Sequence, residues 1–207
     1  MKSFTAGKNE DGVRLSRFVQ SVTTNFPSSL LYKSFRNKRV KVNGKKADAD
    51  TRLCFGDVIE LYINDEFFSA APQKAPLQKL QSKFALQIIF EDENIAVLYK
   101  PAHLLCHSDH TGDISLVELF CDYLHKSGLY FPEKENTFTP AICNRLDRGT
   151  EGLVLAAKSY AALRDMNEII RTDLLQKEYL CITAGVPVQG VHTAYYSIAE
   201  RSTKNPF

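Results

Sequence analysis

The sequence has no long apolar run, no paired cysteines and no apolar core near its start. No stretch approaches the roughly 18 consecutive apolar residues of a membrane-spanning helix. The first residues, MKSFTAGKNEDGVRLSRF, lack the apolar core of a secretory signal. The five cysteines are scattered without a C-x-x-C pair, a pattern typical of reduced and mostly buried thiols. We therefore expect a cytoplasmic protein without a membrane partner.

Acidic residues are absent between Arg14 and Ala47, and they dominate from Asp48 to Glu66. Nine basic residues occupy the acid-free span: Arg14, Arg17, Lys33, Arg36, Lys38, Arg39, Lys41, Lys45 and Lys46. Phosphate contacts supply most of the non-specific affinity for nucleic acid, so this block predicts an anionic partner. A solvated basic face is the alternative reading of the same composition.

The basic segment also has a readable local structure. A first helix is predicted by apolar residues at helical spacing, Leu15, Phe18, Val19 and Val22. PSSLLYKSFRN predicts a second helix, with one apolar face formed by Leu30, Leu31 and Phe35. RVKVNGKKA predicts a hairpin through Asn43-Gly44, and LCFGDVIELYI predicts a closing strand after a Gly-Asp turn.

This segment, from Asp11 to Ile63, resembles the small RNA-binding module named after ribosomal protein S-four. RLSRFV, LLYKSFRNKRVKVNGKKA and GDVIELY carry the resemblance. In that module the second helix and the following strand present basic side chains to folded RNA. The resemblance therefore implies an RNA-binding domain over residues 11–66, with these phosphate-contacting residues: Lys33, Arg36, Lys38, Arg39 and Lys41.

Residues 67–83 are predicted to be a linker, because SAAPQKAPLQKLQSK is rich in proline and polar residues. Strands are then predicted on both sides of the acidic turn Glu91–Asn94, and a short helix over Leu116–Tyr123. EGLVLAA and KEYLCITAG read as strands. Between them, SYAALRDMNEIIRT reads as a helix whose inward residues are Leu163, Met166, Ile169 and Ile170. Helices and strands in both orders favour an α+β fold class over a regular parallel α/β unit.

The stretch CNRLDRGTEGLVLAA places Asp147 between two arginines, Arg145 and Arg148. If the chain is extended here, Arg145 and Asp147 share one side and Leu146 anchors on the other. A neighbouring arginine favours the ionised carboxylate, which in a cleft can act as a nucleophile. Taken alone, the stretch fits a structural arginine–aspartate pair better than a catalytic carboxylate.

With its flanking segments, the same stretch resembles the catalytic domain of the RluA-like pseudouridine synthases. The resemblance rests on NRLDRGTEG, on IIFEDENIAVLYKPAHLL before it and on KEYLCITAG after it. It implies a mixed-sheet catalytic domain over residues 84–207. It also implies a reaction without metal or cofactor, in which uracil is detached, rotated and rejoined to the ribose through carbon.

The resemblance assigns roles to individual residues. Asp147 would be the catalytic carboxylate, and it could engage either the ribose or the base. Arg145 would hold the flipped nucleotide, fill the space it vacates or pair with Asp147. Tyr179 would pack on the uracil, and Thr150 and Lys177 would make supporting contacts.

Two features depart from the family's pattern. Asn144 stands where many members carry histidine, and it can donate a hydrogen bond but cannot titrate near neutrality. The sequence also ends at RSTKNPF, before an arginine-rich segment that completes the cleft in the family. We therefore expect a C-terminally incomplete catalytic domain.

HLLCHSDH gathers possible zinc ligands: His103, Cys106, His107, Asp109 and His110. Structural zinc sites usually draw paired ligands from two separated segments, and the sequence has no second cluster. We predict no metal site here.

These observations predict an RNA pseudouridine synthase that acts on uridines in structured RNA, ribosomal RNA before transfer RNA, with no protein partner. One alternative is an RNA-binding protein without catalytic activity. Another is a hydrolase that needs a second carboxylate acting with Asp147, for which Glu151 is the near candidate.

Overall fold

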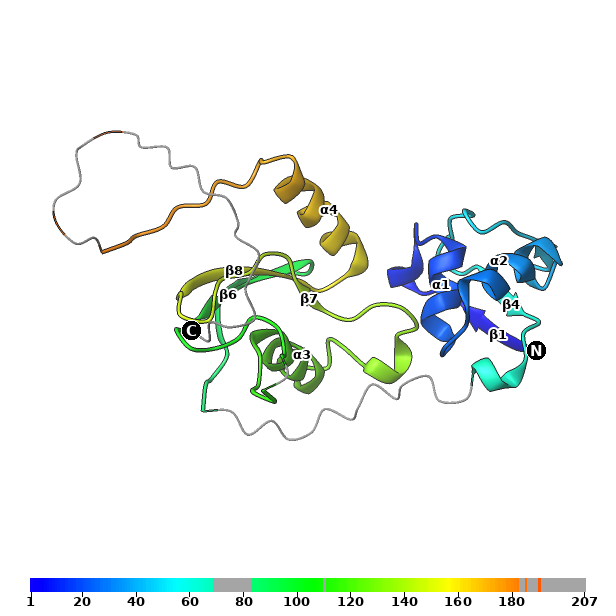
Figure 1. Ribbon diagram of the computed structural model, residues 1–207, viewed down its shortest axis with the longest axis horizontal. Helices are drawn as coiled ribbons and strands as arrows, with labels where there is room; N and C mark the ends of the chain where they lie inside the picture. The colour runs from blue at the N-terminus through cyan, green and yellow to red at the C-terminus, as the bar shows by residue number, and fades with distance from the viewer. Residues whose placement is uncertain (69–82, 110, 183–184, 186–189, 191–207) are drawn as a thin grey trace, which may run out of the picture. The chain divides into compact units, whose positions relative to one another are not determined.

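The computed structural model describes residues 1–68, 83–109, 111–182, 185 and 190 (Figure 1). The chain divides into two compact units, Met1–Leu174 and Leu175–Phe207. The described residues of the first unit form two four-stranded sheets, in its N-terminal and C-terminal parts. No helix among the described residues is long and apolar enough to cross a membrane.

The N-terminal part is an antiparallel sheet with two short helices. Its strand order is β1-β4-β2-β3, with bounds β1 Lys2–Thr5, β2 Val40–Val42, β3 Lys45–Lys46 and β4 Val58–Leu61. The helices are α1 Leu15–Val22 and α2 Ser28–Arg36, and two 3₁₀ turns cover Lys8–Glu10 and Asp65–Phe67. The predicted order of two helices, a hairpin and a closing strand is confirmed.

Helical periodicity decides which residues of this part are buried. All four apolar residues predicted for α1 are buried, and each stabilises the fold by about 1.5–3 kcal/mol. In α2, Leu31 and Phe35 are buried, but Leu30 is 38% exposed, so its predicted inward position is wrong. Leu30 is five residues from Phe35 and therefore lies off the apolar face, where Ser34 takes the inner position.

The predicted hairpin forms through Asn43-Gly44, which joins β2 to β3. Both residues have a left-handed backbone, with φ of 51° and 74°, as a two-residue hairpin turn requires. The Asn43 side chain accepts from the Val58 N–H (2.9 Å) and donates to Asp57 (2.8 Å). The turn is therefore tied to the start of β4.

One strand and one residue outside the predicted domain bounds of 11–66 belong to this part of the fold. Strand β1 pairs along β4, and Phe68 is buried at 6% exposure. Most of the predicted linker, residues 69–82, lies outside the described residues.

The second sheet carries the Asp147 stretch. Its strand order is β5-β6-β8-β7, with bounds β5 Gln87–Glu91, β6 Ile95–Lys100, β7 Ala141–Ile142 and β8 Gly152–Ala157. The helices are α3 Leu116–Lys126 and α4 Tyr160–Arg171, with a 3₁₀ turn at Pro132–Lys134. The α+β class is confirmed. The sheet is not mixed as predicted: all its described strand pairs are antiparallel, because tight turns and loops reverse the chain between neighbours.

Helix α3 packs beneath this sheet (Figure 1). Its buried residues Leu116, Phe120 and Leu124 meet Leu98 of β6 and Val154 of β8 in one core cluster. A capping box fixes its start, where the Ser115 N–H donates to Glu118 (2.8 Å). The four residues predicted to face inward from α4 are half-buried, and Ala162 is its buried residue.

Two other predictions differ from the structure. Residues 177–182 are described without strand structure, so the strand predicted for KEYLCITAG is wrong there, and residues 183–184 lie outside the described residues. A strand forms only against a partner, and no described strand pairs with this segment. Cys54 and Cys181 are exposed rather than buried, whereas Cys106 and Cys121 are buried.

Candidate active site

Asp147 lies in the loop that joins β7 to β8. Its neighbour Leu146 is 8% exposed, whereas Arg145 and Asp147 are exposed. The predicted alternation of side chains is therefore confirmed. Asn144 fixes the base of the loop, because its Oδ1 accepts from the Leu155 N–H (2.7 Å).

The loop is held on both sides of Asp147 by the segment that follows β6. The Cys106 thiol accepts from the Leu146 N–H and donates to the Leu146 carbonyl, both at 3.3 Å. On the other side, the Arg148 carbonyl accepts from the His103 N–H (2.7 Å) and from Lys100 Nζ (3.3 Å). The backbone at Asp147 is therefore fixed from two directions while its carboxylate stays exposed.

Lys100 is fully buried at the end of β6. Its Nζ donates to the carbonyls of Pro101 (3.1 Å), Leu104 (2.9 Å) and Arg148 (3.3 Å). Burial lowers the pKa of the Lys100 ammonium, and the charge of the Asp147 carboxylate opposes that shift. Sequence reasoning gave Lys100 no role. Strand alternation could have predicted its burial, because Lys100 lies two residues after Leu98 and therefore on the same face of the strand.

Asp147 has no ion-pair partner among the described residues. Arg148 pairs instead with Asp113, 35 residues earlier, with Nη2 2.8 Å from Oδ2. The structural arginine–aspartate pair expected from the stretch alone is therefore wrong for Asp147. Its carboxylate is left available to a ligand.

The other predicted residues lie in three places. The Thr150 N–H donates to the Asp147 carbonyl (3.0 Å), which closes the turn after the aspartate. Glu151, the alternative second carboxylate, accepts from the Tyr99 hydroxyl (3.0 Å), and this hydrogen bond raises the pKa of Tyr99. Lys177 and Tyr179 are exposed and belong to the second unit, so their roles stay predictions.

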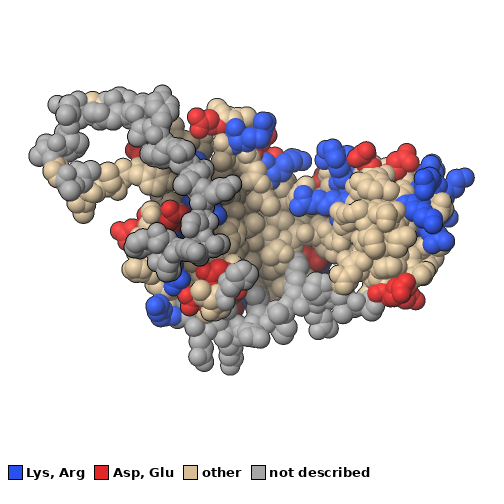
Figure 2. All heavy atoms as spheres, viewed as in Figure 1, with Lys and Arg blue, Asp and Glu red and all other residues tan. Residues whose placement is uncertain are grey.

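The predicted RNA-binding residues lie along α2 and β2. Figure 2 shows Lys and Arg gathered over the N-terminal part where α2 lies. None of the five has an ion-pair partner within the described residues: Lys33, Arg36, Lys38, Arg39 and Lys41. Lys38 has a φ of 59° at the end of α2, where glycine is the usual residue. Lys41 Nζ lies 5.0 Å from the centre of the Tyr62 ring.

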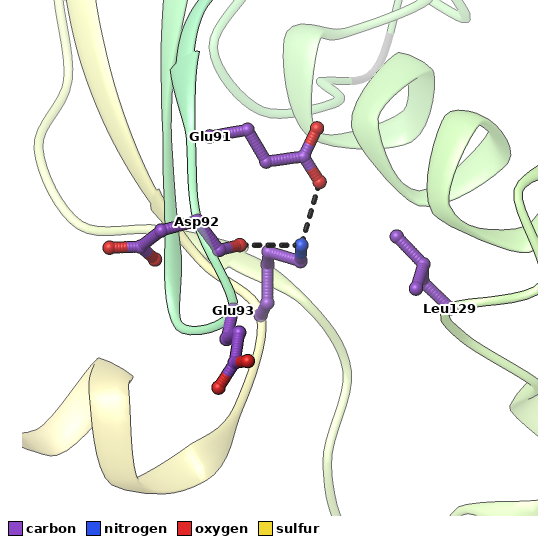
Figure 3. Close-up of a pocket in the computed structure, with 5 residues that line it drawn as sticks. Glu91, Asp92, Glu93 and Leu129 are labelled. Carbon is purple, nitrogen blue, oxygen red and sulfur yellow. Dashed lines mark hydrogen bonds and ion pairs between the residues drawn. The ribbon is translucent and has the colours of Figure 1, made fainter.

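A hollow of about 540 Å³ lies beside the β5–β6 turn (Figure 3). Three acidic residues line it, Glu91, Asp92 and Glu93, together with Leu129 and Lys158. Lys158 Nζ is already bound to Glu91 Oε1 and to the Asp92 carbonyl, each at 2.7 Å. This acidic hollow does not suit a phosphate ligand, and none of the predicted site residues lines it.

Residues 94–206, more than half of the chain, match the family model described as RNA pseudouridylate synthase. The chain is 29% identical to ribosomal large subunit pseudouridine synthase C of Haemophilus influenzae, over 89% of this chain and 54% of that protein. It is 30% identical to an uncharacterized RNA pseudouridine synthase of Mycoplasma pneumoniae, over 94% of this chain and 59% of that protein. It thus spans somewhat more than half the length of these relatives. The matched residues include the loop that carries exposed Asp147. The chain belongs to the RNA pseudouridylate synthase family and carries the RluA-like type of motif.

Proposed function

We propose that this chain converts uridine to pseudouridine in structured RNA, with Asp147 as the catalytic carboxylate. The observation that carries the proposal is the state of Asp147. Its side chain is exposed and has no ion-pair partner among the described residues, yet its backbone is fixed at Leu146 and at Arg148. A preorganised carboxylate of this kind suits a reaction in which the enzyme supplies one nucleophilic or charge-stabilising group.

The reaction exchanges two bonds at the anomeric carbon of the ribose. The bond from C1′ to N1 of uracil breaks, the base rotates, a bond from C1′ to C5 forms, the proton on C5 leaves and N1 takes up a proton. Asp147 would engage the ribose or the base. Arg145, exposed on the same side of the extended stretch, would hold the extruded nucleotide. Tyr179, Thr150 and Lys177 are proposed as supporting contacts.

We propose ribosomal RNA as the first substrate to examine, since several of the relatives are named as ribosomal large subunit synthases. The cations of α2 and β2, which lack ion-pair partners within the described part of the chain, would supply phosphate contacts that position the RNA without reading its sequence. Reversing the charges of Arg36, Lys38 and Arg39 together should weaken binding. The slope of log affinity against log salt should flatten by about 2–3, since each phosphate contact contributes about 0.7–0.9.

Tritium release from RNA labelled at C5 of uracil tests the reaction directly. The parent chain should release tritium from unmodified ribosomal RNA, and Asp147→Asn should abolish release while leaving RNA affinity and thermal stability nearly unchanged. Asp165→Asn is a matched control, because Asp165 is also an exposed aspartate and lies on α4. Release by Asp147→Asn at the parent rate would refute the assigned role.

A second candidate is an RNA-binding protein without catalytic activity. The cations of α2 and β2, which have no ion-pair partner among the described residues, favour it, because they need no catalytic domain to hold RNA. RNA binding by the parent chain without tritium release from any ribosomal or transfer RNA would support this candidate.

A further inference from the structure

A second hollow, of about 390 Å³, lies against the backbone that follows Asp147. Its walls include Lys83, Phe84, His103, Asp113 and Arg148, which come from the segment before β5, from the β6–α3 loop and from the β7–β8 loop. Its volume lies within the range of small-molecule sites and is large enough for one nucleotide. Unlike the acidic hollow beside the β5–β6 turn, it combines cations with an aromatic ring.

The chain itself connects this hollow to the catalytic aspartate. Arg148 is the next residue after Asp147, and its carbonyl accepts from the His103 N–H at 2.7 Å. Two residues of the wall are therefore joined beside the catalytic carboxylate. In an RNA whose target uridine is at Asp147, a neighbouring nucleotide is the group that can reach this wall.

His103 gives independent evidence that the wall serves a ligand. Its φ is 71°, a left-handed conformation that costs free energy in every residue with a Cβ. Glycine would adopt this backbone without strain, but histidine stands here with an exposed side chain. Strained non-glycine residues of this kind cluster at ligand sites. An imidazole can both stack on a base and donate a hydrogen bond to it.

The remaining groups match the two halves of a nucleotide. Phe84 is half-buried and has Lys83 Nζ 5.3 Å from its ring centre, so an aromatic surface and a cation lie together. Arg148 is half exposed, and its guanidinium is paired with the half-exposed carboxylate of Asp113. A guanidinium has five donors in a fork that fits phosphate, so a phosphate can take the place of the Asp113 carboxylate.

We infer that this hollow binds the nucleotide next to the target uridine, with its base against Phe84 and His103 and its phosphate on Arg148 and Lys83. The inference rests on the proposed function and adds a flanking-nucleotide site to it. Asp113 competes with the phosphate for Arg148. Removal of the Asp113 charge therefore strengthens nucleotide binding, whereas removal of Arg148 weakens it.

Trinucleotides that carry uridine and one 2-aminopurine, on its 5′ or its 3′ side, test this site with the 207-residue chain. Stacking quenches 2-aminopurine fluorescence, so a titration gives both the contact and the dissociation constant. One of the two isomers should be quenched. Phe84→Ala and Arg148→Ala should each weaken its binding at least about fivefold, and Asp113→Asn should tighten it. His103→Gly should also weaken binding without loss of fold, because glycine accepts the φ of 71°.

Matched controls come from the same chain. Phe55→Ala removes an exposed phenylalanine outside the hollow, and Arg164→Ala removes an exposed arginine that is paired with Asp165. Both should leave the dissociation constant unchanged. The inference is overturned if Phe84→Ala and Arg148→Ala bind like the parent chain, or if Asp113→Asn fails to tighten binding.

Failure of this site and failure of the proposed function give different results. Tritium release by the parent chain, with trinucleotide affinity unaffected by Phe84→Ala and Arg148→Ala, would remove the site and keep the function. Absence of release, with the expected shifts in trinucleotide affinity, would remove the function and keep the nucleotide site.

Discussion

Replacing the buried Lys100 with methionine should destabilise the protein by about 2 kcal/mol. Methionine keeps most of the apolar length of the side chain, so the change removes the ammonium without creating a large cavity. Lys100 Nζ donates to three backbone carbonyls in the parent chain. The effect depends on which of these carbonyls keep another donor.

Two of the three carbonyls stay satisfied. The Arg148 carbonyl keeps the His103 N–H (2.7 Å), and the Pro101 carbonyl keeps a long bond from the Leu104 N–H (3.4 Å). The Leu104 carbonyl has no second donor among the described residues, and a buried unsatisfied carbonyl costs about 1–3 kcal/mol. Relief from burying the ammonium offsets part of this loss, so we place the net cost near the middle of that range.

Thermal and denaturant unfolding measure this cost. A loss of about 2 kcal/mol corresponds to a fall in Tm of about 4–8 °C for a protein of about 150–250 residues, and this chain has 207 residues. The His103 amide, which donates to the same Arg148 carbonyl, should also exchange its hydrogen faster. Lys126→Met is the control, because that side chain is 70% exposed on α3, and its effect should stay within about 0.5 kcal/mol. Equal stability of Lys100→Met and the parent chain would refute the reasoning.

Three further predictions concern other groups of the fold. Burial raises the pKa of Glu91, but the hydrogen bond and charge of Lys158, together with a hydrogen bond from a tyrosine hydroxyl, outweigh burial and hold the pKa below 4.5. The stability that this ionised carboxylate supplies is present above pH 4.5 and is lost as the pH falls below it. Glu91→Gln should therefore flatten the acid side of a Tm–pH curve, and an unchanged curve would contradict this. Burial raises the pKa of the Cys143 thiol to about 11. After iodoacetamide treatment at pH 8, peptide mass spectrometry should find exposed Cys54 labelled and Cys143 unlabelled. Equal labelling of the two cysteines would be inconsistent with the raised pKa. Lys38→Gly should raise Tm, because it relieves a φ of 59°, while it weakens RNA binding in a filter assay; a lower Tm would argue against strain at this position.

Much of the fold could be predicted from local patterns. The spacing of Leu15, Phe18, Val19 and Val22 predicted the buried face of α1, and Asn43-Gly44 predicted the hairpin. Alternation predicted that Leu146 is buried and that Asp147 is exposed. These predictions succeed because helix, hairpin and strand geometry couple residues only a few positions apart.

The same local reasoning failed where a residue depends on a distant partner. The described strand pairs of the second sheet are all antiparallel, although the family resemblance implied a mixed sheet, because strand direction depends on the path of the chain between neighbours. KEYLCI has the composition of a strand, but it has no described partner strand. Strand identity depends on pairing, which composition does not contain.

The sequence by itself determined the helices, the hairpin and the exposed aspartate between two arginines. Tertiary structure alone decided how that aspartate is held. Arg148 pairs with Asp113, 35 residues away, rather than with the adjacent aspartate, and Lys100 reaches the Arg148 carbonyl across 48 residues. The Cys106 thiol meets Leu146 across 40 residues. Such contacts follow from the path of the chain around β6, α3 and β8, because only the folded core brings these loops within hydrogen-bonding distance.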